Sequence, residues 1–538
     1  MLSTMMHTPL GVPTLLHFGA RHFTESRVGD FDGTSLHWQT YGDIYQLAGR
    51  LANGLAALGI NAGDRIGTFL WNGSTHLGVY LAAPGMGAVL HTLNCRLAPE
   101  QIAYIIHHAG DRCVFVDGRL EAQFQPVLAD IPGVEHIILC GSGGGLDDPR
   151  VMTLEALLAE QPPSFDWPEI PEEQAAGICY TSGTTGNPKG VVYSHKTTYL
   201  HALASRAVDS FGVNERDSIL MLPAMFHANA WGFPYSGWLS GADMVMPGPH
   251  TQLPHLKNMI VTARPTLTAM VPTILGDLLR DDSLTEEHMG CFRALVCGGS
   301  AVPSFMIEQA RARWGVPVIQ GWGMTETSPM CVLSHPPKHM GSTAETSWRM
   351  KSGRPVPGMM VRVVDDSGHP LPEDGKTVGE LELKGAWVTG SYLDVDSDAI
   401  THDGWLRTGD VGHIDAKGYV QLTDRKKDVI KSGGEWISSV DLEDVILQHP
   451  SVAEVAVIGT ADERWQERPL AIVVPAIGQP ASAGDLRAFL EGKVARFWVP
   501  EYWHFTDQIP RTSVGKIDKK RLRNQLDSEQ FSIEVCRE

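Results

Sequence analysis

The sequence predicts a protein of mixed α/β and α+β class, with a large N-terminal domain of doubly wound sheets plus a small β-barrel, and a small, mobile α+β C-terminal lid domain. Three observations lead to this prediction. Helix-like and strand-like segments alternate through residues 41–116 and again through 294–320. From about 350 to 424, short alternating runs are separated by Gly, Asp and Pro turns. Beyond residue 432, the sequence predicts further strands and helices, enough to form a small separate domain.

The first alternating region predicts one parallel sheet with helices on both faces. Residues 41–60 place Ile44, Leu51 and Leu55 at helical spacing, which indicates an amphipathic helix. Strands and helices then follow one another, as parallel strands with crossover connections require. In order, the predicted elements are the helix 41–60, the strand 65–71, the helix 77–83, the strand 88–93, the helix 99–108 and the strand 113–116.

Composition excludes several classes of function. The 538 residues include 43 Lys and Arg against 62 Asp and Glu, a formal net charge of −19, which disfavours broad binding to nucleic acid or anionic membranes. The eight cysteines are scattered without a C-x-x-C pair, so reduced thiols in a cytoplasmic protein are expected. The N-terminus does not resemble a signal peptide, and no apolar run has transmembrane length. Stable membrane insertion is therefore not expected.

A loop rich in glycine and hydroxyl residues, YTSGTTGNPKGV at 180–191, follows an apolar, strand-like run. Glycines let the backbone approach a ligand, and hydroxyl and N–H groups form an anion-binding concavity. The loop is not a Walker A motif, because Asn187 and Pro188 separate Gly186 from Lys189 and no Ser or Thr follows the lysine. It predicts phosphate binding outside the ATPase class. The candidate residues are Thr181, Ser182, Gly183, Thr184, Thr185, Gly186 and Lys189.

Two further polar segments follow predicted strands. PAMFHANAWG at 223–232 places His227 and Trp231 just after a strand, where α/β folds bind ligands, although these residues alone favour a core aromatic beside a hydrogen-bonded histidine. GWGMTET at 321–327 combines an aromatic platform suited to a purine, a threonine hydroxyl and a carboxylate, Glu326, suited to Mg²⁺.

Three segments in the last third of the chain complete the candidate site. GWLRTGD at 404–410 ends in Asp410, whose carboxylate could bind two vicinal hydroxyls. The charge-rich run 424–438 separates two regions with different patterns of predicted strands and helices. It contains Gly433 and Gly434, whose backbone freedom would permit a hinge. IPRTSVGKI at 509–517 presents Lys516 before a basic helix. Each segment alone could equally be a turn or solvated surface.

Taken together, these segments resemble, in order, the six motifs of the adenylate-forming superfamily, which includes acyl-CoA synthetases, luciferases and peptide-synthetase adenylation domains. With their flanks they cover roughly residues 30–526. One departure is Trp322, where the family usually has tyrosine. The resemblance implies an N-terminal adenylation domain over residues 1–424, a hinge over 425–431 centred on Lys427, and a lid over 432–538.

The resemblance also implies a two-step reaction with ATP, Mg²⁺ and coenzyme A. A carboxylate would attack the α-phosphorus of ATP to give an acyl-adenylate and diphosphate, and the thiol of coenzyme A would then displace AMP. Lys516 would bridge the carboxylate and the α-phosphate, while Thr181 and Glu326 would organise Mg²⁺. His227 would orient the acid. The remaining nucleotide and coenzyme A residues would be Gly299, Ser300, Ala301, Gln320, Gly321, Trp322, Gly323, Met324, Thr325, Asp410, Arg425, Lys431, Gly433 and Gly434.

The acid itself is predicted from the apolar pocket wall. His227, Trp231, Gly232 and Gly298 are the substrate candidates, and no Arg or Lys lies in these segments to bind a second carboxylate. The sequences of segments 226–232 and 432–439 are most similar to those of bacterial fatty acyl-CoA synthetases and of 3-methylmercaptopropionate–CoA ligases. In the fatty acyl-CoA synthetases, the tryptophan that matches Trp231 gates an acyl tunnel. The resemblance favours 3-methylmercaptopropionate or another short-to-medium monocarboxylic acid, with a long-chain fatty acid as the alternative. A carrier-loading or luciferase-like enzyme stays open, and the fatty acyl relatives suggest a homodimer.

Overall fold

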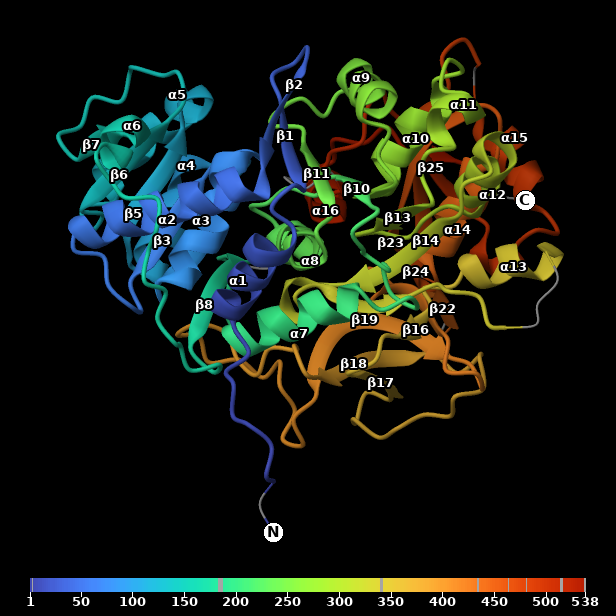
Figure 1. The fold of residues 1–538 in the computed structure, drawn as a ribbon. Helices are drawn as coiled ribbons and strands as arrows, with labels where there is room; N and C mark the ends of the chain where they lie inside the picture. The colour runs from blue at the N-terminus through green and yellow to red at the C-terminus, as the bar shows by residue number, and fades with distance from the viewer. Residues whose placement is uncertain are drawn as a thin grey trace.

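The structure is a computed structural model in which four β-sheets carry helices on their faces (Figure 1). The first helix, α1 (Val12–His22), precedes all the sheets. Among the helices that the structure describes, none is long and apolar enough to span a bilayer. The described residues are 1, 3–181, 187–338, 342–432, 435–462, 464–479, 481–512 and 516–536, without the side chains of 342–344 and 435–436.

The first sheet has seven strands in the order β7-β6-β5-β3-β4-β8-β9, all parallel except β9. Helix α2 begins at a capping box, in which Thr40 and Asp43 bind each other's backbone N–H. Every helix and strand predicted between residues 41 and 116 is present. The elements are α2 (Tyr41–Ala57), β3 (Arg65–Phe69), α3 (Ser74–Gly85), β4 (Val89–Thr92), α4 (Pro99–Ala109), β5 (Asp111–Asp117), α5 (Glu121–Phe124), β6 (His136–Cys140), β7 (Val151–Thr153), α6 (Leu154–Leu158), β8 (Ala175–Tyr180) and β9 (Gly190–Ser194).

The second sheet has nine strands in the order β16-β15-β14-β13-β12-β10-β11-β1-β2, parallel in its centre and antiparallel at both edges. Its β1–β2 hairpin comes from the N-terminus, where Arg27 N–H donates to Asp243 at 2.7 Å. The strands are β1 (Arg27–Phe31), β2 (Leu36–Thr40), β10 (Ser218–Leu220), β11 (Asp243–Met246), β12 (Leu267–Met270), β13 (Ala294–Gly298), β14 (Val318–Gly323), β15 (Met330–Leu333) and β16 (Arg354–Pro355). The helices are α7 (His195–Ser205), α8 (Phe233–Ser240), α9 (Leu253–Ala263), α10 (Pro272–Arg280), α11 (Glu286–Met289), α12 (Ser304–Trp314) and α13 (Ser342–Arg349).

The two large sheets share one core around α8, all of whose residues are buried (Figure 1). The Trp238 ring stacks on Tyr41 at 4.3 Å, and its indole N–H donates to the Leu16 carbonyl at 3.1 Å. Side chains from α1, α2 and α8 therefore meet in one cluster, which ties the N-terminal helix to both sheets. Strands β10 and β13 contribute Ile219, Ala294 and Val296 to the same cluster, so the loops that follow these two strands start from this core.

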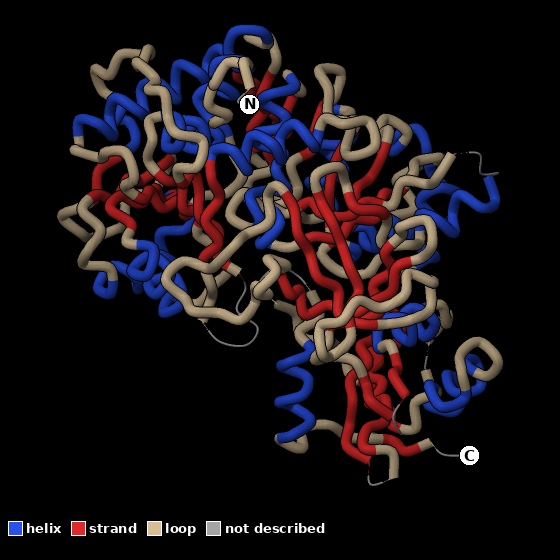
Figure 2. The backbone as a smooth tube through the Cα atoms, turned by 90° about the horizontal axis from the view of Figure 1, so that it is seen from below, coloured by secondary structure: helices blue, strands red, loops and turns tan. Residues whose placement is uncertain are grey.

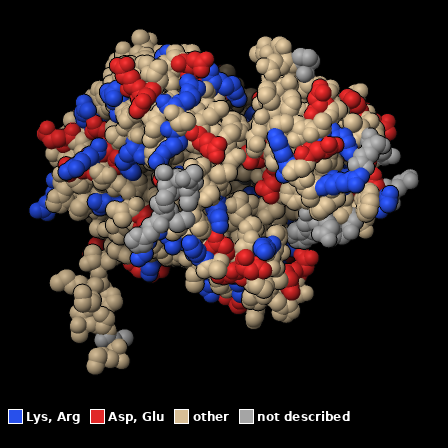
Figure 3. Space-filling view, turned by 90° about the vertical axis from the view of Figure 1, so that its right-hand side faces the viewer, with Lys and Arg blue, Asp and Glu red and all other residues tan. Residues whose placement is uncertain are grey.

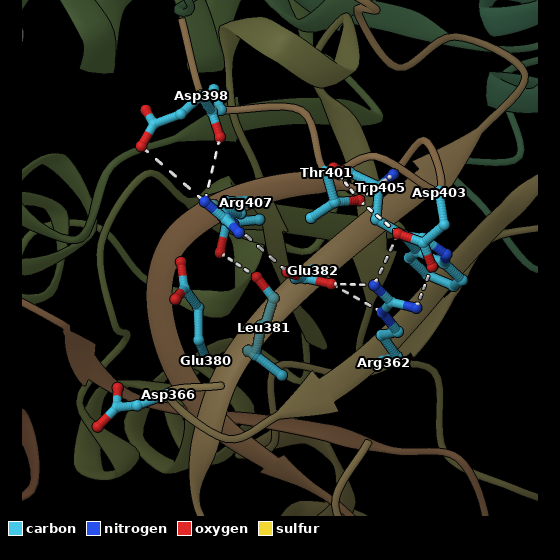
Figure 4. A network of polar contacts seen from close by, with 12 residues as sticks. Arg362, Asp366, Glu380, Leu381, Glu382, Asp398, Thr401, Asp403, Trp405 and Arg407 are labelled. Carbon is cyan, nitrogen blue, oxygen red and sulfur yellow. Dashed lines mark hydrogen bonds and ion pairs between the residues drawn. The ribbon is translucent and has the colours of Figure 1, made fainter. Parts of the chain in front are cut away.

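The predicted small β-barrel is observed as a four-stranded antiparallel sheet, β17 (Met359–Val364), β18 (Gly379–Gly385), β19 (Leu406–Ile414) and β20 (Val420–Arg425). Figure 4 shows the polar network on it, centred on the Glu382 side chain, which is 2% exposed. Glu382 accepts from Arg362 at 2.6 Å and faces Arg407 at 3.8 Å, while Arg362 also binds Asp403 at 2.7 Å. This network anchors the strand that carries Asp410.

The C-terminal domain has a sheet in the order β22-β21-β24-β25-β26, with β23 paired to β24. It has its own core, which includes Leu442 and Trp503. Figure 2 shows this sheet at one end of the molecule, beside the C-terminus. The elements are β21 (Ile430–Ser432), β22 (Glu435–Ile437), α14 (Ser439–Leu447), β23 (Val452–Asp462), β24 (Gln466–Pro475), α15 (Ala483–Leu490), β25 (Tyr502–Phe505), α16 (Lys519–Asp527) and β26 (Glu534–Val535).

Candidate active site

Lys516 of the C-terminal domain points into the N-terminal domain. A methyl group built on Gly299, in the loop after β13, would lie 3.6 Å from Lys516 Cε. The Lys516 ammonium also interacts electrostatically with Asp410, Glu326 and His227. Five positions that lie far apart in the sequence therefore meet around this one cation.

Burial lowers the pKa of Lys516 to about 8, and the nearby Arg425 guanidinium contributes in the same direction. The Asp410 and Glu326 carboxylates act in the opposite direction and favour the charged form. Near neutral pH the side chain thus stays a cation, but one that is partly desolvated. A cation in such a place interacts strongly with a phosphate or carboxylate, because little water screens it.

Asp410 lies on β19 with both carboxylate oxygens engaged. The Trp322 indole N–H donates to Oδ2 at 2.9 Å, and Arg425 Nε pairs with Oδ1 at 2.7 Å. Burial raises the pKa of Asp410, whereas Arg425 and Trp322 lower it. The tryptophan that replaces the usual tyrosine therefore connects the predicted purine platform to the predicted ribose-binding carboxylate, a link that the sequence did not reveal.

The predicted magnesium ligands lie on two elements near the glycine-rich loop. Glu326 is buried and accepts a hydrogen bond from the Tyr392 hydroxyl at 2.6 Å, while Lys189 lies 4.9 Å from the Tyr392 ring centroid. Thr181 N–H donates to the Lys189 carbonyl at 2.9 Å, and its hydroxyl accepts from Lys189 N–H at 3.2 Å. These hard oxygen donors suit Mg²⁺, which usually combines one or two protein ligands with phosphate oxygens and water. Among the described residues there is no group of three or more His, Cys, Asp and Glu that could hold a metal.

The segment after His227 has an unusual backbone. Ala228, Asn229, Ala230 and Trp231 all have positive φ angles, between 41° and 59°, and Gly232 follows at 80°. Side-chain residues in this left-handed region cost roughly 1–2 kcal/mol each, so the surrounding packing must hold the turn.

This left-handed turn brings Trp231 to the loop after β13. The Trp231 ring approaches Gly298, where an added methyl group would lie 3.2 Å from Cη2. A methyl group on Gly232 would overlap the His201 ring. The predicted substrate residues Trp231, Gly232 and Gly298 are therefore packed closely together.

His227 is neutral at physiological pH. Burial lowers its pKa to about 4, and the charges of Lys516 and Arg96 add to that effect. The N–H of a neutral imidazole can donate a hydrogen bond to a carboxylate without adding charge. Arg96, which lies 5.9 Å from the Phe226 ring centroid, belongs to no recognisable motif, so the sequence alone does not indicate it.

Several predicted residues contribute in other ways. The Gln320 side chain accepts from Val302 N–H at 2.9 Å and donates to the Met350 carbonyl at 3.2 Å, so it supports the loop that contains Ser300 and Ala301. Gly321, Trp322 and Gly323 end β14, and Met324 and Thr325 follow it. Lys431 lies on β21, where its N–H donates to Glu467 at 2.8 Å.

The predicted hinge lies between β20 and β21. Lys427 is exposed there and follows Lys426, which pairs with Glu380 at 2.9 Å and with Asp366 at 3.1 Å. The predicted residues that lie outside the described part of the chain are Ser182, Gly183, Thr184, Thr185, Gly186, Gly433 and Gly434.

Comparison with known proteins identifies the family of the chain. Residues 22–393 match the family model of the AMP-binding enzyme, and residues 441–516 match that of the AMP-binding enzyme C-terminal domain. The chain is 41% identical to a 3-methylmercaptopropionyl-CoA ligase of Ruegeria lacuscaerulensis, covering 98% of this chain and 99% of the relative. It is 42% identical to a long-chain-fatty-acid–CoA ligase of Thermus thermophilus, covering 97% of both chains.

Solved structures share the fold. The anthranilate CoA ligase AuaEII in complex with anthranoyl-AMP superposes with a TM-score of 0.88 at 24% identity, covering 98% of this chain and 100% of that one. ATP-bound MatB from Rhodopseudomonas palustris superposes with a TM-score of 0.83 at 25% identity, covering 96% and 99%. The chain therefore belongs to the AMP-binding enzyme family, within the adenylate-forming acyl-CoA synthetases whose motifs it carries.

Proposed function

We propose that the protein is an ATP- and Mg²⁺-dependent acyl-CoA ligase for a short-to-medium monocarboxylic acid, with 3-methylmercaptopropionate as the first candidate. The products are acyl-CoA, AMP and diphosphate. The observation that carries this proposal is the position of Lys516, whose Cε lies beside Gly299 and whose ammonium interacts electrostatically with Asp410, Glu326 and His227. A cation there would face both the acid and the nucleotide.

In the first step a carboxylate oxygen attacks the α-phosphorus of ATP, and the bond from that phosphorus to diphosphate breaks. Lys516 stabilises the negative charge that the acid and the α-phosphate bring together, and neutral His227 hydrogen-bonds the carboxylate. Asp410 and Arg425 hold the ribose. Mg²⁺, held by Thr181 and Glu326, would neutralise phosphate charge. Positioning and charge stabilisation do most of the work in such a transfer.

In the second step the thiol of coenzyme A attacks the acyl carbonyl carbon, a thioester forms, and AMP leaves. The lid, residues 432–538, turns about the hinge 425–431 at Lys427 and withdraws Lys516 from the N-terminal domain, residues 1–424. Gly433 and Gly434 would leave room for the pantetheine arm, and Lys431, on β21, would bind near it. The approach of Lys516 Cε to Gly299, 3.6 Å from a methyl group built there, supports the arrangement proposed for the first step.

The size of the acid follows from the wall that Trp231 makes. Its ring lies close to Gly298, where an added methyl group would be 3.2 Å from Cη2, and a bulky ring at this place supports a short tail. Two relatives, at 41% and 39% identity, are 3-methylmercaptopropionyl-CoA ligases of Ruegeria species, which supports the same choice. A long-chain fatty acid is the second candidate, because the Thermus thermophilus relative acts on long chains at 42% identity.

A substrate series distinguishes these acids. The enzyme would be incubated with ATP, Mg²⁺ and coenzyme A against acids from propionate and 3-methylmercaptopropionate to palmitate, and both AMP and acyl-CoA would be measured. A maximum at 3-methylmercaptopropionate or butyrate-sized acids would support the proposal, and a maximum at palmitate would replace it with the long-chain candidate. AMP without acyl-CoA would indicate a carrier-loading or luciferase-like enzyme. Lys516→Ala serves as the control for turnover at this site.

We expect a homodimer in the cytoplasm, with no nucleic-acid or membrane partner. The segment before α1 extends away from the body with Met1 and Met6 exposed, which makes it available to a second copy (Figures 1 and 3). The face in Figure 3 mixes acidic and basic side chains without a basic stripe. All eight cysteines are free, as a reducing compartment allows. Sedimentation of the full chain, compared with a variant lacking residues 1–10, would test the dimer.

A further inference from the structure

Helix α12 begins without a cap of its own. Its N-cap residue is Pro303, which has no side-chain oxygen, and no side chain from the helix's own start caps it. The first N–H groups of a helix have no partner inside the helix and need an acceptor from elsewhere. Here the acceptor is Asp444, on α14 of the C-terminal domain. Asp444 Oδ1 accepts from Ser304 N–H at 3.1 Å, and Oδ2 accepts from the Ser304 hydroxyl at 3.1 Å.

This contact lies next to the Lys516 contact. Gly299, which Lys516 Cε approaches, and Ser304, which Asp444 caps, are at the two ends of one short loop after β13. The C-terminal domain therefore touches both ends of the same loop, once with a cation and once with a carboxylate. A rotation of that domain large enough to remove Lys516 would also remove the cap.

The surroundings of Asp444 agree with a contact between domains rather than within one. The side chain is half-buried, burial raises its pKa, and the hydrogen bonds from Ser304 act in the opposite direction. Glu308, one turn further along α12, acts against the carboxylate through its like charge. The negative carboxylate also complements the positive end of the helix dipole.

We propose that Asp444 is a positioning residue that caps α12 only while Lys516 is inserted, and so favours the adenylation arrangement over the thiolation arrangement. The inference rests on the proposed two-step function. Capping by a side-chain oxygen stabilises a helix enough to change the equilibrium between the capped and uncapped arrangements by roughly 2- to 30-fold. Losing it would lower the population of the Lys516-inserted state by up to that factor.

The test measures the two half-reactions separately in the full-length enzyme. Diphosphate release from ATP and acid without coenzyme A reports adenylation, and acyl-CoA formed from a prepared acyl-adenylate reports thiolation. For Asp444→Ala we expect the ratio of the adenylation rate to the thiolation rate to fall by roughly 2- to 30-fold, because the cap stabilises only the Lys516-inserted arrangement. Asp444→Asn, which keeps a capping oxygen, should recover much of the loss. Glu308→Gln should raise adenylation slightly.

Asp485→Ala is the matched control. Asp485 lies in the first turn of α15, where its carboxylate accepts from Ser482, a contact wholly inside the C-terminal domain. Its loss should weaken that domain without favouring either half-reaction. If Asp444→Ala lowered both half-reactions equally, or neither, the capping role would be wrong.

A second measurement does not depend on turnover. Amide hydrogen exchange at Ser304 and Phe305 should be faster in Asp444→Ala than in the wild-type enzyme, with exchange elsewhere in the N-terminal domain unchanged. Equal exchange would overturn the inference. If the wild-type protein formed no acyl-adenylate from any acid while this difference was present, the proposed function would fail and the domain contact would stand.

Discussion

The hydrogen bond from Trp322 to Asp410 gives the sharpest prediction about nucleotide binding. Trp322→Phe keeps an aromatic ring for the purine and removes the indole N–H that donates to Oδ2 at 2.9 Å. A hydrogen bond to a charged group is worth about 1.5–3 kcal/mol, or roughly 10- to 100-fold. Arg425 still holds Oδ1, so the carboxylate loses one of two anchors. We expect kcat/KM for ATP to fall by up to that factor, mainly through KM.

Trp322→Phe should also change the pH dependence of kcat/KM for ATP. Burial raises the pKa of Asp410, and the Trp322 N–H is one of the groups that lower it. Without that donor the pKa rises further, so the acid limb of kcat/KM for ATP should move to higher pH. The assay is initial-rate diphosphate release with the acid saturating and ATP varied across a pH series.

Trp387→Phe is the matched control. Trp387 is also buried, and its indole N–H donates at 2.8 Å, but to the Met330 carbonyl rather than to Asp410. This variant should lose stability without moving the acid limb. The reasoning would be refuted if Trp322→Phe left both KM and the acid limb unchanged, or if the two variants behaved alike.

Three further predictions concern other parts of the molecule. Gly232→Ala should destabilise the protein by about 2–5 kcal/mol in urea unfolding, because the cost of its positive φ adds to the cost of the overlap with the buried His201 ring. Gly418→Ala is the control, since Gly418 also has a positive φ, 75°, but open space around it, and it should cost only about 1–2 kcal/mol. Equal losses would contradict the packing that we describe. The kcat/KM for adenylation should fall as pH rises through about 8, where the Lys516 ammonium loses its proton, and Lys516→Arg should lose that alkaline limb. Glu382→Ala should cost about 1–3 kcal/mol in the same unfolding assay, because it removes the buried carboxylate that pairs with Arg362 and faces Arg407 while Arg362 keeps only Asp403, and no measurable loss would argue against the network.

The sequence predicted where the functional groups gather better than how they are held. Lys516, Asp410 and Glu326 were found because each belongs to a motif with a fixed chemical purpose, and the fold brings them together around one cation. Their roles in catalysis stay predictions until the variants are measured. The elements of the first sheet were predictable for a simpler reason, since helical and strand periodicities alternate there.

Other features left no local signal. The indole of Trp322 and the carboxylate of Asp410 are 88 residues apart, and nothing at either position indicates the other. The left-handed turn around Trp231 was also unexpected, because hydrophobic spacing reports which face is buried and says nothing about the sign of φ. The same limit applies to Asp444, whose partner lies in another domain.

The N-terminal hairpin has a consequence for how the chain is made. Strand β1 pairs with β11, and Arg27 binds Asp243 across 216 residues of sequence. At a synthesis rate of about 5–20 residues per second, β1 would leave the ribosome roughly 10–40 s before its partner. During that interval the hairpin has an unpaired edge and its apolar residues lack their core. The nascent chain therefore needs protection at its start, by a chaperone or by the early folding of α1 and α2 over that edge.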